Sequence, residues 1–140
     1  MKTVLLVEDD KFYAEALIRV LRGAGFEAVA ASNAPAALRV VAGGGIDLII
    51  SDLHMPRMDG LEFRGEVASS EPTGGGIPFV FLSGMVEDCD REVARGMGVQ
   101  HFLQKPVDLT KLVELSRELT RFRPPVQKQT TNFLRDSVTG

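Results

Sequence analysis

Four short apolar runs in this chain each end near a residue whose side chain is charged or carries a hydroxyl. The runs at residues 3–7, 48–50, 79–82 and 100–103 are followed within two residues by Glu8 and Asp9, Asp52, Ser83 and Lys105. A run that is apolar at every position is typical of a parallel strand covered on both faces. Because α/β proteins place ligand crevices where the carboxyl ends of such strands meet, we expect these five side chains to gather at one edge.

Helical patterns alternate with these runs and with a further apolar run at residues 26–30. The expected helices cover residues 11–22, 34–42, 61–69, 87–97 and 109–122. Asn33 stands where a helix N-cap is expected. Phe12, Ala16, Val20 and Leu21 lie on adjoining turns of the first helix. Five strand–helix repeats predict an α/β fold with a doubly wound, five-stranded parallel sheet, right-handed crossovers and helices on both faces.

Residues 1–122 are expected to form one domain. The residues after it, 123–140, read as a polar C-terminal tail or the start of a linker, because Pro124 and Pro125 end the last helix. That tail is too short for an added DNA-binding or catalytic domain. The sequence leaves open whether the chain is a stand-alone protein or a piece of a longer one.

Composition excludes several classes of protein. The apolar stretches are strand-sized, which predicts no membrane span, and the N-terminus lacks a secretory signal, which favours a cytoplasmic location. Cys89 is the single cysteine, so no internal disulfide forms. Residues 1–120 carry a net charge of −6 and residues 121–140 a net charge of +3, which together give the −3 of the chain. An acidic body argues against direct nucleic-acid binding.

The three acidic residues Glu8, Asp9 and Asp52 predict a metal site. Packed carboxylates repel each other unless a cation joins them, and Mg²⁺ prefers oxygen ligands while keeping several waters. Acidic residues at strand ends are also common as solvated surface residues. That interpretation could explain any one of these three acids, but it explains the group poorly.

Asp52 has neighbours that suit phosphoryl transfer. A carboxylate can attack phosphorus and hold the phosphoryl group as an acyl phosphate. The transition state needs a cation, a hydrogen-bond donor and a positive side chain around its oxygens. Mg²⁺, the Ser83 hydroxyl and Lys105 would supply these three. A cis peptide bond between Lys105 and Pro106 is compatible with the sequence but is not decided by it.

Four segments resemble the receiver domain of two-component response regulators, in the manner of a chemotaxis regulator. They are residues 4–10 (VLLVEDD), 47–60 (DLIISDLHMPRMDG), 81–84 (FLSG) and 104–106 (QKP). The resemblance implies the flavodoxin-like strand order 2-1-3-4-5 that chemotaxis receivers have. It extends from residue 2 to about residue 122.

The resemblance also implies roles for individual residues. Asp52 would be the phosphoacceptor, and Glu8 and Asp9 the acidic pair that holds Mg²⁺, with Asp9 as the direct ligand. His54 would offer its backbone carbonyl to the metal and place its imidazole at the mouth of the site. On phosphorylation Ser83 would move toward the phosphoryl group. Phe102 would then turn inward.

The predicted function is therefore a phosphorylation-dependent signalling switch and not an enzyme. A histidine kinase or phosphotransfer protein would supply the phosphoryl group. The output would be a downstream protein target, an output domain in a longer chain or a phospho-dependent dimer, reached through the fourth helix, fifth strand and fifth helix.

Two alternative functions are weaker. An unphosphorylated receiver-like interaction module typically lacks one of the acids, the lysine or the hydroxyl, and all are present here. An aspartyl-phosphate phosphohydrolase usually carries a second acid two residues after its nucleophile, where this chain has His54.

Overall fold

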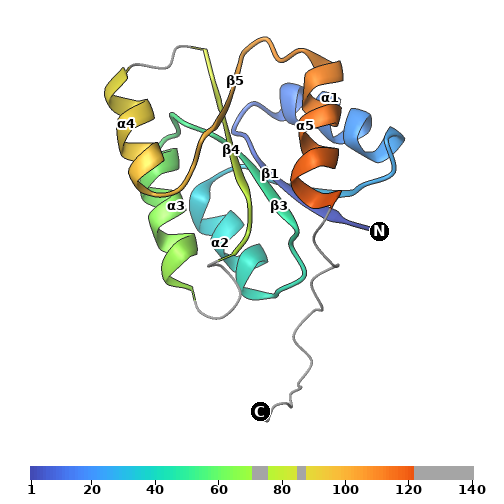
Figure 1. Cartoon of the computed structure of the whole chain (residues 1–140). Helices are drawn as coiled ribbons and strands as arrows, with labels where there is room; N and C mark the ends of the chain where they lie inside the picture. Colours follow the sequence, from blue (N-terminus) through green and yellow to red (C-terminus); the bar gives the residue numbers. More distant parts are fainter. Residues whose placement is uncertain (71–75, 85–87, 122–140) are drawn as a thin grey trace.

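The chain forms an open parallel sheet with helices on both faces, seen in a computed structural model that describes residues 1–70, 76–84 and 88–121 (Figure 1). The strands are β1 (Thr3–Val7), β2 (Glu27–Ala31), β3 (Leu48–Asp52), β4 (Phe79–Ser83) and β5 (His101–Gln104). Their order is β2-β1-β3-β4-β5 and every neighbouring pair is parallel. The predicted fold class and strand order are confirmed.

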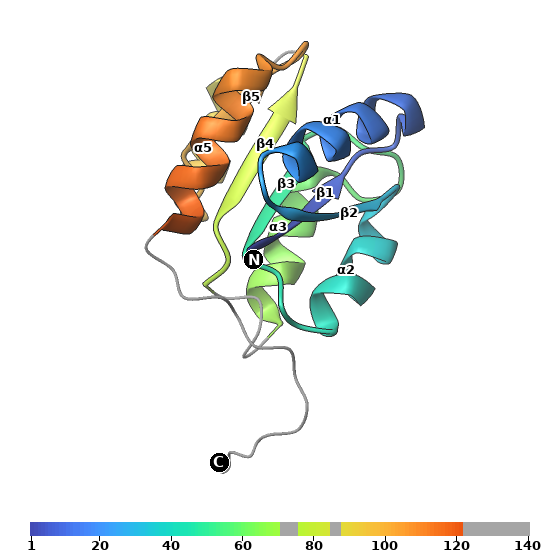
Figure 2. The same ribbon diagram turned by 90° about the vertical axis from the view of Figure 1, so that its right-hand side faces the viewer.

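Five helices cover the sheet. They are α1 (Lys11–Gly23), α2 (Ala34–Ala42), α3 (Gly60–Ser69), α4 (Asp88–Gly96) and α5 (Leu109–Arg121). Helices α1 and α5 share one apolar core with the sheet, and α2, α3 and α4 share the other (Figures 1 and 2). Every residue of β1, β3 and β4 is buried, because these central strands are covered on both faces.

Two predicted strands are displaced by one residue. The strand expected at residues 26–30 is Glu27–Ala31, because the Phe26 N–H donates to the Leu21 carbonyl of α1 (3.1 Å). Gly25, at φ +100°, makes the reversal that allows this bond. The strand expected at residues 100–103 is His101–Gln104. The third and fourth strands extend further than expected and include Asp52 and Ser83 as their last residues.

The buried face of α1 agrees only in part with the stripe that the sequence predicted. Leu21 is buried as expected, and Val20 is partly buried, but Phe12 is 86% exposed and Ala16 is exposed. The other buried residues of the helix are Ala14, Leu17 and Ile18. The Asp10 side chain accepts from the Tyr13 N–H and caps the helix, which sets the first turn and thereby the exposed position of Phe12.

Helix α3 begins directly beneath the end of β3. Asp59 caps it by accepting from the Glu62 N–H (2.8 Å), and the Glu62 side chain accepts from the Asp59 N–H (3.2 Å). The Gly60 N–H donates to the Leu53 carbonyl (2.6 Å), so the helix start is tied to the residue after Asp52. The predicted tail at residues 123–140 lies outside the described residues.

Candidate functional site

Two buried carboxylates lie side by side at the carboxyl edge of the sheet. Asp52 is the last residue of β3 and Glu8 follows β1, and the pairing of Val7 with Ser51 brings these strand ends together. Only 2% of Glu8 and 3% of Asp52 is exposed. Asp9 is exposed beside them, and single carboxylate oxygens of Glu8, Asp9 and Asp52 all lie within 4.8 Å of one another. The structure thus brings together the three acids that the sequence singled out.

Lys105 reaches both buried carboxylates from the end of β5. Its Nζ lies 2.6 Å from Glu8 Oε1 and 2.7 Å from Asp52 Oδ1. The Lys105 N–H donates to the Ser83 carbonyl (2.8 Å), which fixes the backbone of the lysine against β4. The Lys105–Pro106 peptide bond is cis.

The hydroxyl of Tyr13 also holds this segment, a role that the sequence did not indicate. It accepts from the Val107 N–H (2.9 Å), and the Tyr13 ring lies 5.1 Å from Lys105 Nζ. The residues at the two ends of this bond are far apart in sequence. The bond joins α1 to the segment between β5 and α5.

Burial and repulsion set the protonation of the two carboxylates. Burial, followed by the hydrogen bond and the charge of Glu8, raises the pKa of Asp52 to about 8, although Lys105 acts in the opposite direction. Burial would also raise the pKa of Glu8, but hydrogen bonds from Asp52, Lys105 and the Asp10 N–H outweigh it and hold that pKa below its ordinary value. The same two carboxylates raise the pKa of Lys105 against its own desolvation. Asp52 is therefore the carboxylate that most needs a further cation when it is ionised.

The donors at this edge fit Mg²⁺. Mg²⁺ takes oxygen ligands and usually binds through one or two carboxylates and several waters, and here an exposed carboxylate, Asp9, adjoins two buried ones. Asp52 Oδ1 is buried, and Lys105 Nζ lies 2.7 Å from it. This one ammonium is shared with Glu8, so the site has fewer positive charges than carboxylates. Asp9 and Asp52 would hold the ion, with Glu8 behind them.

Magnesium is expected to raise the melting temperature of the protein. A ligand that binds only the folded state stabilises it by about 1.4 kcal/mol at ten times its Kd, which corresponds to a shift of a few degrees. The measurement is thermal unfolding at pH 8 with and without millimolar Mg²⁺. Asp9→Asn is expected to lose most of the shift. No shift in the parent, or the same shift in both proteins, would contradict a site at these residues.

Ser83 lies at the end of the strand next to Asp52. It is the last residue of β4 and is buried, and the pairing of Asp52 with Leu82 places it one step further along the same edge. His54 lies two residues after Asp52, just beyond the end of β3. Its side chain is 67% exposed, and its Nε2 is 3.9 Å from Asp90 Oδ2 at the start of α4.

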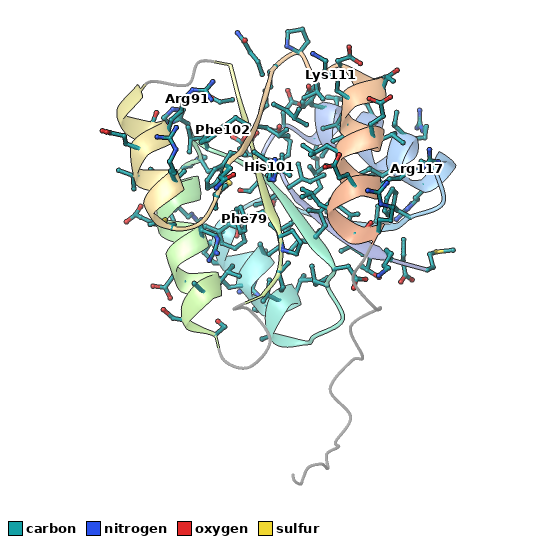
Figure 3. The ribbon with its side chains drawn as sticks, viewed as in Figure 1. Phe79, Arg91, His101, Phe102, Lys111 and Arg117 are labelled. Carbon is teal, nitrogen blue, oxygen red and sulfur yellow. The ribbon has the colours of Figure 1, made fainter. Side chains whose placement is uncertain are left out.

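Phe102 lies half-buried on β5, where it pairs with Phe81 of β4. Its ring is 5.7 Å from the ring of Phe81, and the guanidinium of Arg91 on α4 covers it at 4.9 Å (Figure 3). Arg91 is a second residue that the sequence did not single out. The sequence gives no indication of this contact, because Arg91 lies on α4 and its partner Phe102 lies on β5.

The sheet order, the paired carboxylates and the lysine define an α/β protein with an acidic cluster at the carboxyl edge of its sheet. A family model described as the response regulator receiver domain matches residues 4–117. The chain belongs to this family. Receiver domains are typically phosphorylation-dependent signalling switches rather than enzymes.

Three relatives illustrate the match. The regulatory protein VirG of Agrobacterium tumefaciens is 31% identical over 90% of this chain, which spans 46% of VirG, about half its length. An uncharacterised 14.6 kDa protein of Leptolyngbya boryana is 33% identical over 87% of this chain, and the match covers 92% of that protein. The crystal structure of the chemotaxis protein CheY4 of Vibrio cholerae superposes with a TM-score of 0.80 at 26% identity, over 85% of this chain and 98% of CheY4.

Within the described residues, no helix has both the length and the apolar character that crossing a membrane requires.

Proposed function

We propose that Asp52 accepts the phosphoryl group and that a histidine kinase or phosphotransfer protein supplies it. The observation that carries this proposal is the environment of Asp52, whose carboxylate is buried beside Glu8 and has its Oδ1 2.7 Å from Lys105 Nζ. Glu8 shares the lysine but is held ionised and hydrogen-bonded. Asp52 is thus the better placed nucleophile.

In the proposed step an ionised oxygen of Asp52 attacks the phosphorus of a phosphohistidine. An O–P bond forms, the P–N bond breaks, and its electron pair leaves with the imidazole nitrogen. Lys105, 2.7 Å from Asp52 Oδ1, stays beside the transferred group and offsets its charge, and Ser83 offers a hydroxyl proton to one of its oxygens. Mg²⁺, when bound, supplies the remaining positive charge. Because the attacking oxygen must be ionised, any cation that lowers the pKa of Asp52 favours the reaction.

The same proposal gives Ser83 and Phe102 the role of the switch. The phosphoryl group adds a charge of roughly −1.5 to −2 at the end of β3. Ser83 on β4 is drawn toward it, and Phe102 on the neighbouring strand β5 moves into the space that is left. Arg91 now covers the outer side of the Phe102 ring, so this movement also frees a side chain of α4. The altered surface of α4, β5 and α5 would then bind a downstream target, an output domain or a second phosphorylated copy.

Residues 1–122 would be the receiver domain and residues 123–140 a tail or the start of a linker. The family match at residues 4–117 and the end of α5 at Arg121 support this division. We place the protein in the cytoplasm, where it would act as a signalling protein with no enzymatic turnover of an external substrate.

Intact-protein mass spectrometry after incubation with acetyl phosphate and Mg²⁺ tests the proposal. A gain of one phosphoryl group that hydroxylamine removes is expected, because an acyl phosphate reacts with this nucleophile and a phosphate ester does not. Omission of Mg²⁺ should suppress the gain. A folded protein that gains nothing would instead support the unphosphorylated interaction module, and multiple turnover of a phosphate ester would support the phosphohydrolase.

Phe102→Ala is expected to leave labelling by acetyl phosphate intact while it weakens the response to phosphorylation. The proposed phosphoryl transfer takes place at the carboxylates and does not need this ring. The guanidinium of Arg91 on α4, however, contacts the ring. The measurement is the change in backbone amide shifts of α4 and β5 on phosphorylation, which should shrink in the variant. Phe12→Ala, which removes an exposed ring from α1, is the matched control and should leave these changes as in the parent. Loss of labelling in Phe102→Ala would contradict the switch role.

A further inference from the structure

A row of four aromatic rings runs from α3 through β4 to β5. The rings belong to Phe63, Phe79, Phe81 and Phe102, and successive ring centroids are 5.6 Å, 5.1 Å and 5.7 Å apart. The first three side chains are buried, whereas Phe102 is half-buried. Because a close-packed interior transmits strain, a movement of the Phe102 ring affects the other rings of this row.

Arginines from two helices contact this row. The guanidinium of Arg91 on α4 lies 4.9 Å from the centroid of the Phe102 ring, and that of Arg64 on α3 lies 5.5 Å from the centroid of the Phe79 ring. In Figure 3, Phe102 lies beside Arg91, and Phe79 lies further along the sheet, beside α3. A guanidinium over an aromatic face is a favourable contact. The row therefore connects α4, through Arg91, with α3, through Arg64.

Arg64 also binds the C-terminal end of α4. Its Nη2 donates to the carbonyl of Met97 (3.3 Å), the residue that follows the last residue of that helix, Gly96. A cation is favourable at this place because the last carbonyls of a helix lack partners within the helix and form the negative end of its dipole. The side chain of Arg64 thus ties the C-terminal end of α4 to α3.

The tie is incompletely satisfied. Arg64 Nε is buried and has no hydrogen-bond partner within the part of the chain that the structure describes. Burial also holds the pKa of this guanidinium below its ordinary value. A buried donor without a partner costs free energy, and this cost offsets part of what the bond to Met97 and the contact with Phe79 contribute. The tie is therefore weak enough to be released, as the closely balanced arrangements of a switch require.

We propose that Arg64 is a positioning residue of the switch, which holds α4 in its present place and gives way when Phe102 turns inward. This inference rests on the function proposed above for Asp52 and Phe102. The inward movement takes the ring away from Arg91, so that α4 loses this contact with β5 and stays tied at its C-terminal end. Because the tie opposes displacement of α4, it also opposes phosphorylation. Linkage then requires that loss of the tie raise the affinity of the site for a phosphoryl group.

A purely structural role for Arg64 makes a different prediction. Loss of a residue that only stabilised the fold would lower the free energy of unfolding and would leave binding at Asp52 unchanged or weaker. The contacts described for Arg64 are with Met97 and Phe79 and not with the acidic cluster. Tighter binding at Asp52 after the removal of this side chain would therefore report a released contact and not a change in the site itself.

Three variants of the full-length protein test the proposal. Arg64→Met keeps an unbranched apolar side chain and removes the donor. Arg64→Lys keeps a cation that can still donate to the Met97 carbonyl, so it should restore the behaviour of the parent. Arg39→Met removes one positive charge from an exposed position of α2 and controls for the change in net charge.

The first readout is hydrogen exchange of the Gly98 and Val99 amides without any phosphoryl donor. Their N–H groups donate to the Arg95 and Ala94 carbonyls of α4 (2.9 Å and 2.8 Å), so their exchange reports opening at the C-terminal end of this helix. Arg64→Met is expected to exchange about five-fold faster than the parent at these amides, as the loss of one hydrogen bond predicts. Arg39→Met should exchange at the rate of the parent.

The second readout is the affinity for beryllofluoride in the presence of Mg²⁺, measured by titration with backbone amide shifts. Beryllofluoride is a tetrahedral mimic of a phosphoryl group on a carboxylate. Arg64→Met is expected to bind it about three- to ten-fold more tightly than the parent, within the range by which residues between coupled sites alter the coupling. Arg64→Lys and Arg39→Met should bind it as the parent does.

The two readouts distinguish failure of this proposal from failure of the proposed function. Unchanged exchange in Arg64→Met would show that the bond to Met97 does not hold α4, and it would overturn the proposal whatever happens at Asp52. Faster exchange with unchanged or weaker binding of beryllofluoride would leave Arg64 a structural role only. A parent protein that binds no beryllofluoride would contradict the function proposed for Asp52, and the role of Arg64 in switching would fall with it.

Discussion

Asp52→Asn is expected to abolish phosphoryl labelling by acetyl phosphate and, in the same protein, to raise the free energy of unfolding at pH 8 by about 1–3 kcal/mol. The first effect follows because an amide oxygen is a poor nucleophile for phosphorus. The second follows because the substitution removes a buried charge that Glu8 repels. Asp10→Asn is the matched control for labelling. Asparagine also caps helices, so the start of α1 is kept and labelling should persist.

The gain in stability should depend on pH in a defined direction. Since the pKa of Asp52 is raised from 3.8 to about 8, the folded protein holds this proton where the unfolded chain has lost it. The stability that the proton provides is therefore fully present below about pH 4 and is lost as the pH rises toward 8. Asparagine resembles the protonated acid and keeps this stability. The difference between variant and parent should thus be small at pH 4 and largest at pH 8.

Urea unfolding at pH 4.5, 6 and 8 without Mg²⁺ measures this difference. Because the pKa of Glu8 lies below its ordinary value of 4.5, Glu8 affects the pH dependence of stability mainly below pH 4.5. The change in the free energy of unfolding between pH 6 and pH 8 is therefore due to Asp52. Glu118→Gln, a change at an exposed acid of α5, should show no such trend. If the free energy of unfolding of Asp52→Asn exceeds that of the parent by an amount that stays constant or falls as the pH rises, Lys105 already compensates the buried charge.

The parts of the site that follow from strand ends could be predicted from the sequence. Glu8, Asp52 and Lys105 each follow an apolar run, and a parallel sheet necessarily brings the carboxyl ends of its strands to one edge. The distances of 2.6 Å and 2.7 Å that join Lys105 to the two acids are the outcome of that topology. The chemical roles of these residues remain predictions until labelling is measured.

Contacts between side chains of different helices could not be predicted in this way. The bond from the Val107 N–H to the Tyr13 hydroxyl depends on how α1 packs beside α5, and the cover of Phe102 by Arg91 depends on where α4 lies. The prediction of the buried face of α1 was right at Leu21 and wrong at Phe12 and Ala16 for a related reason. A stripe through Phe12 and a stripe through Ala14 and Leu17 both have helical spacing, and the cap at Asp10 together with the sheet decides between them.

Gly60 is a further residue whose importance appears only in three dimensions. A Cβ at this position would lie 2.5 Å from the Asp52 carbonyl oxygen, 2.9 Å from Leu53 Cα and 2.9 Å from the Phe81 ring. Two of these three neighbours are backbone atoms of the segment that carries Asp52, and Phe81 is fully buried. The close approach also allows the 2.6 Å bond from the Gly60 N–H to the Leu53 carbonyl. The first turn of α3 therefore supports the end of β3 by direct contact.

Gly60→Ala is accordingly expected to destabilise the protein by about 3 kcal/mol or more, at the upper end of what overpacking costs, because backbone atoms must move. Gly65→Ala provides the control within the same helix. Its Cβ would have no atom within 4 Å, so the higher helix propensity of alanine should leave stability unchanged or raise it by up to about 1 kcal/mol. Urea unfolding at 25 °C compares the two.

The same pair of variants separates stability from site geometry. If α3 positions Asp52 through Gly60, then Gly60→Ala should label more slowly with acetyl phosphate even at 10 °C and in Mg²⁺, where the folded fraction is highest. Gly65→Ala should label at the rate of the parent, since it leaves the contact with Asp52 untouched. Equal stability of the two variants would show that the backbone near Asp52 yields without cost. Because the Cβ of Gly60 would point at the carbonyl of Asp52 itself, such tolerance would mean that β3 and α3 move independently, and the site would then owe its geometry to β1 and β5 alone.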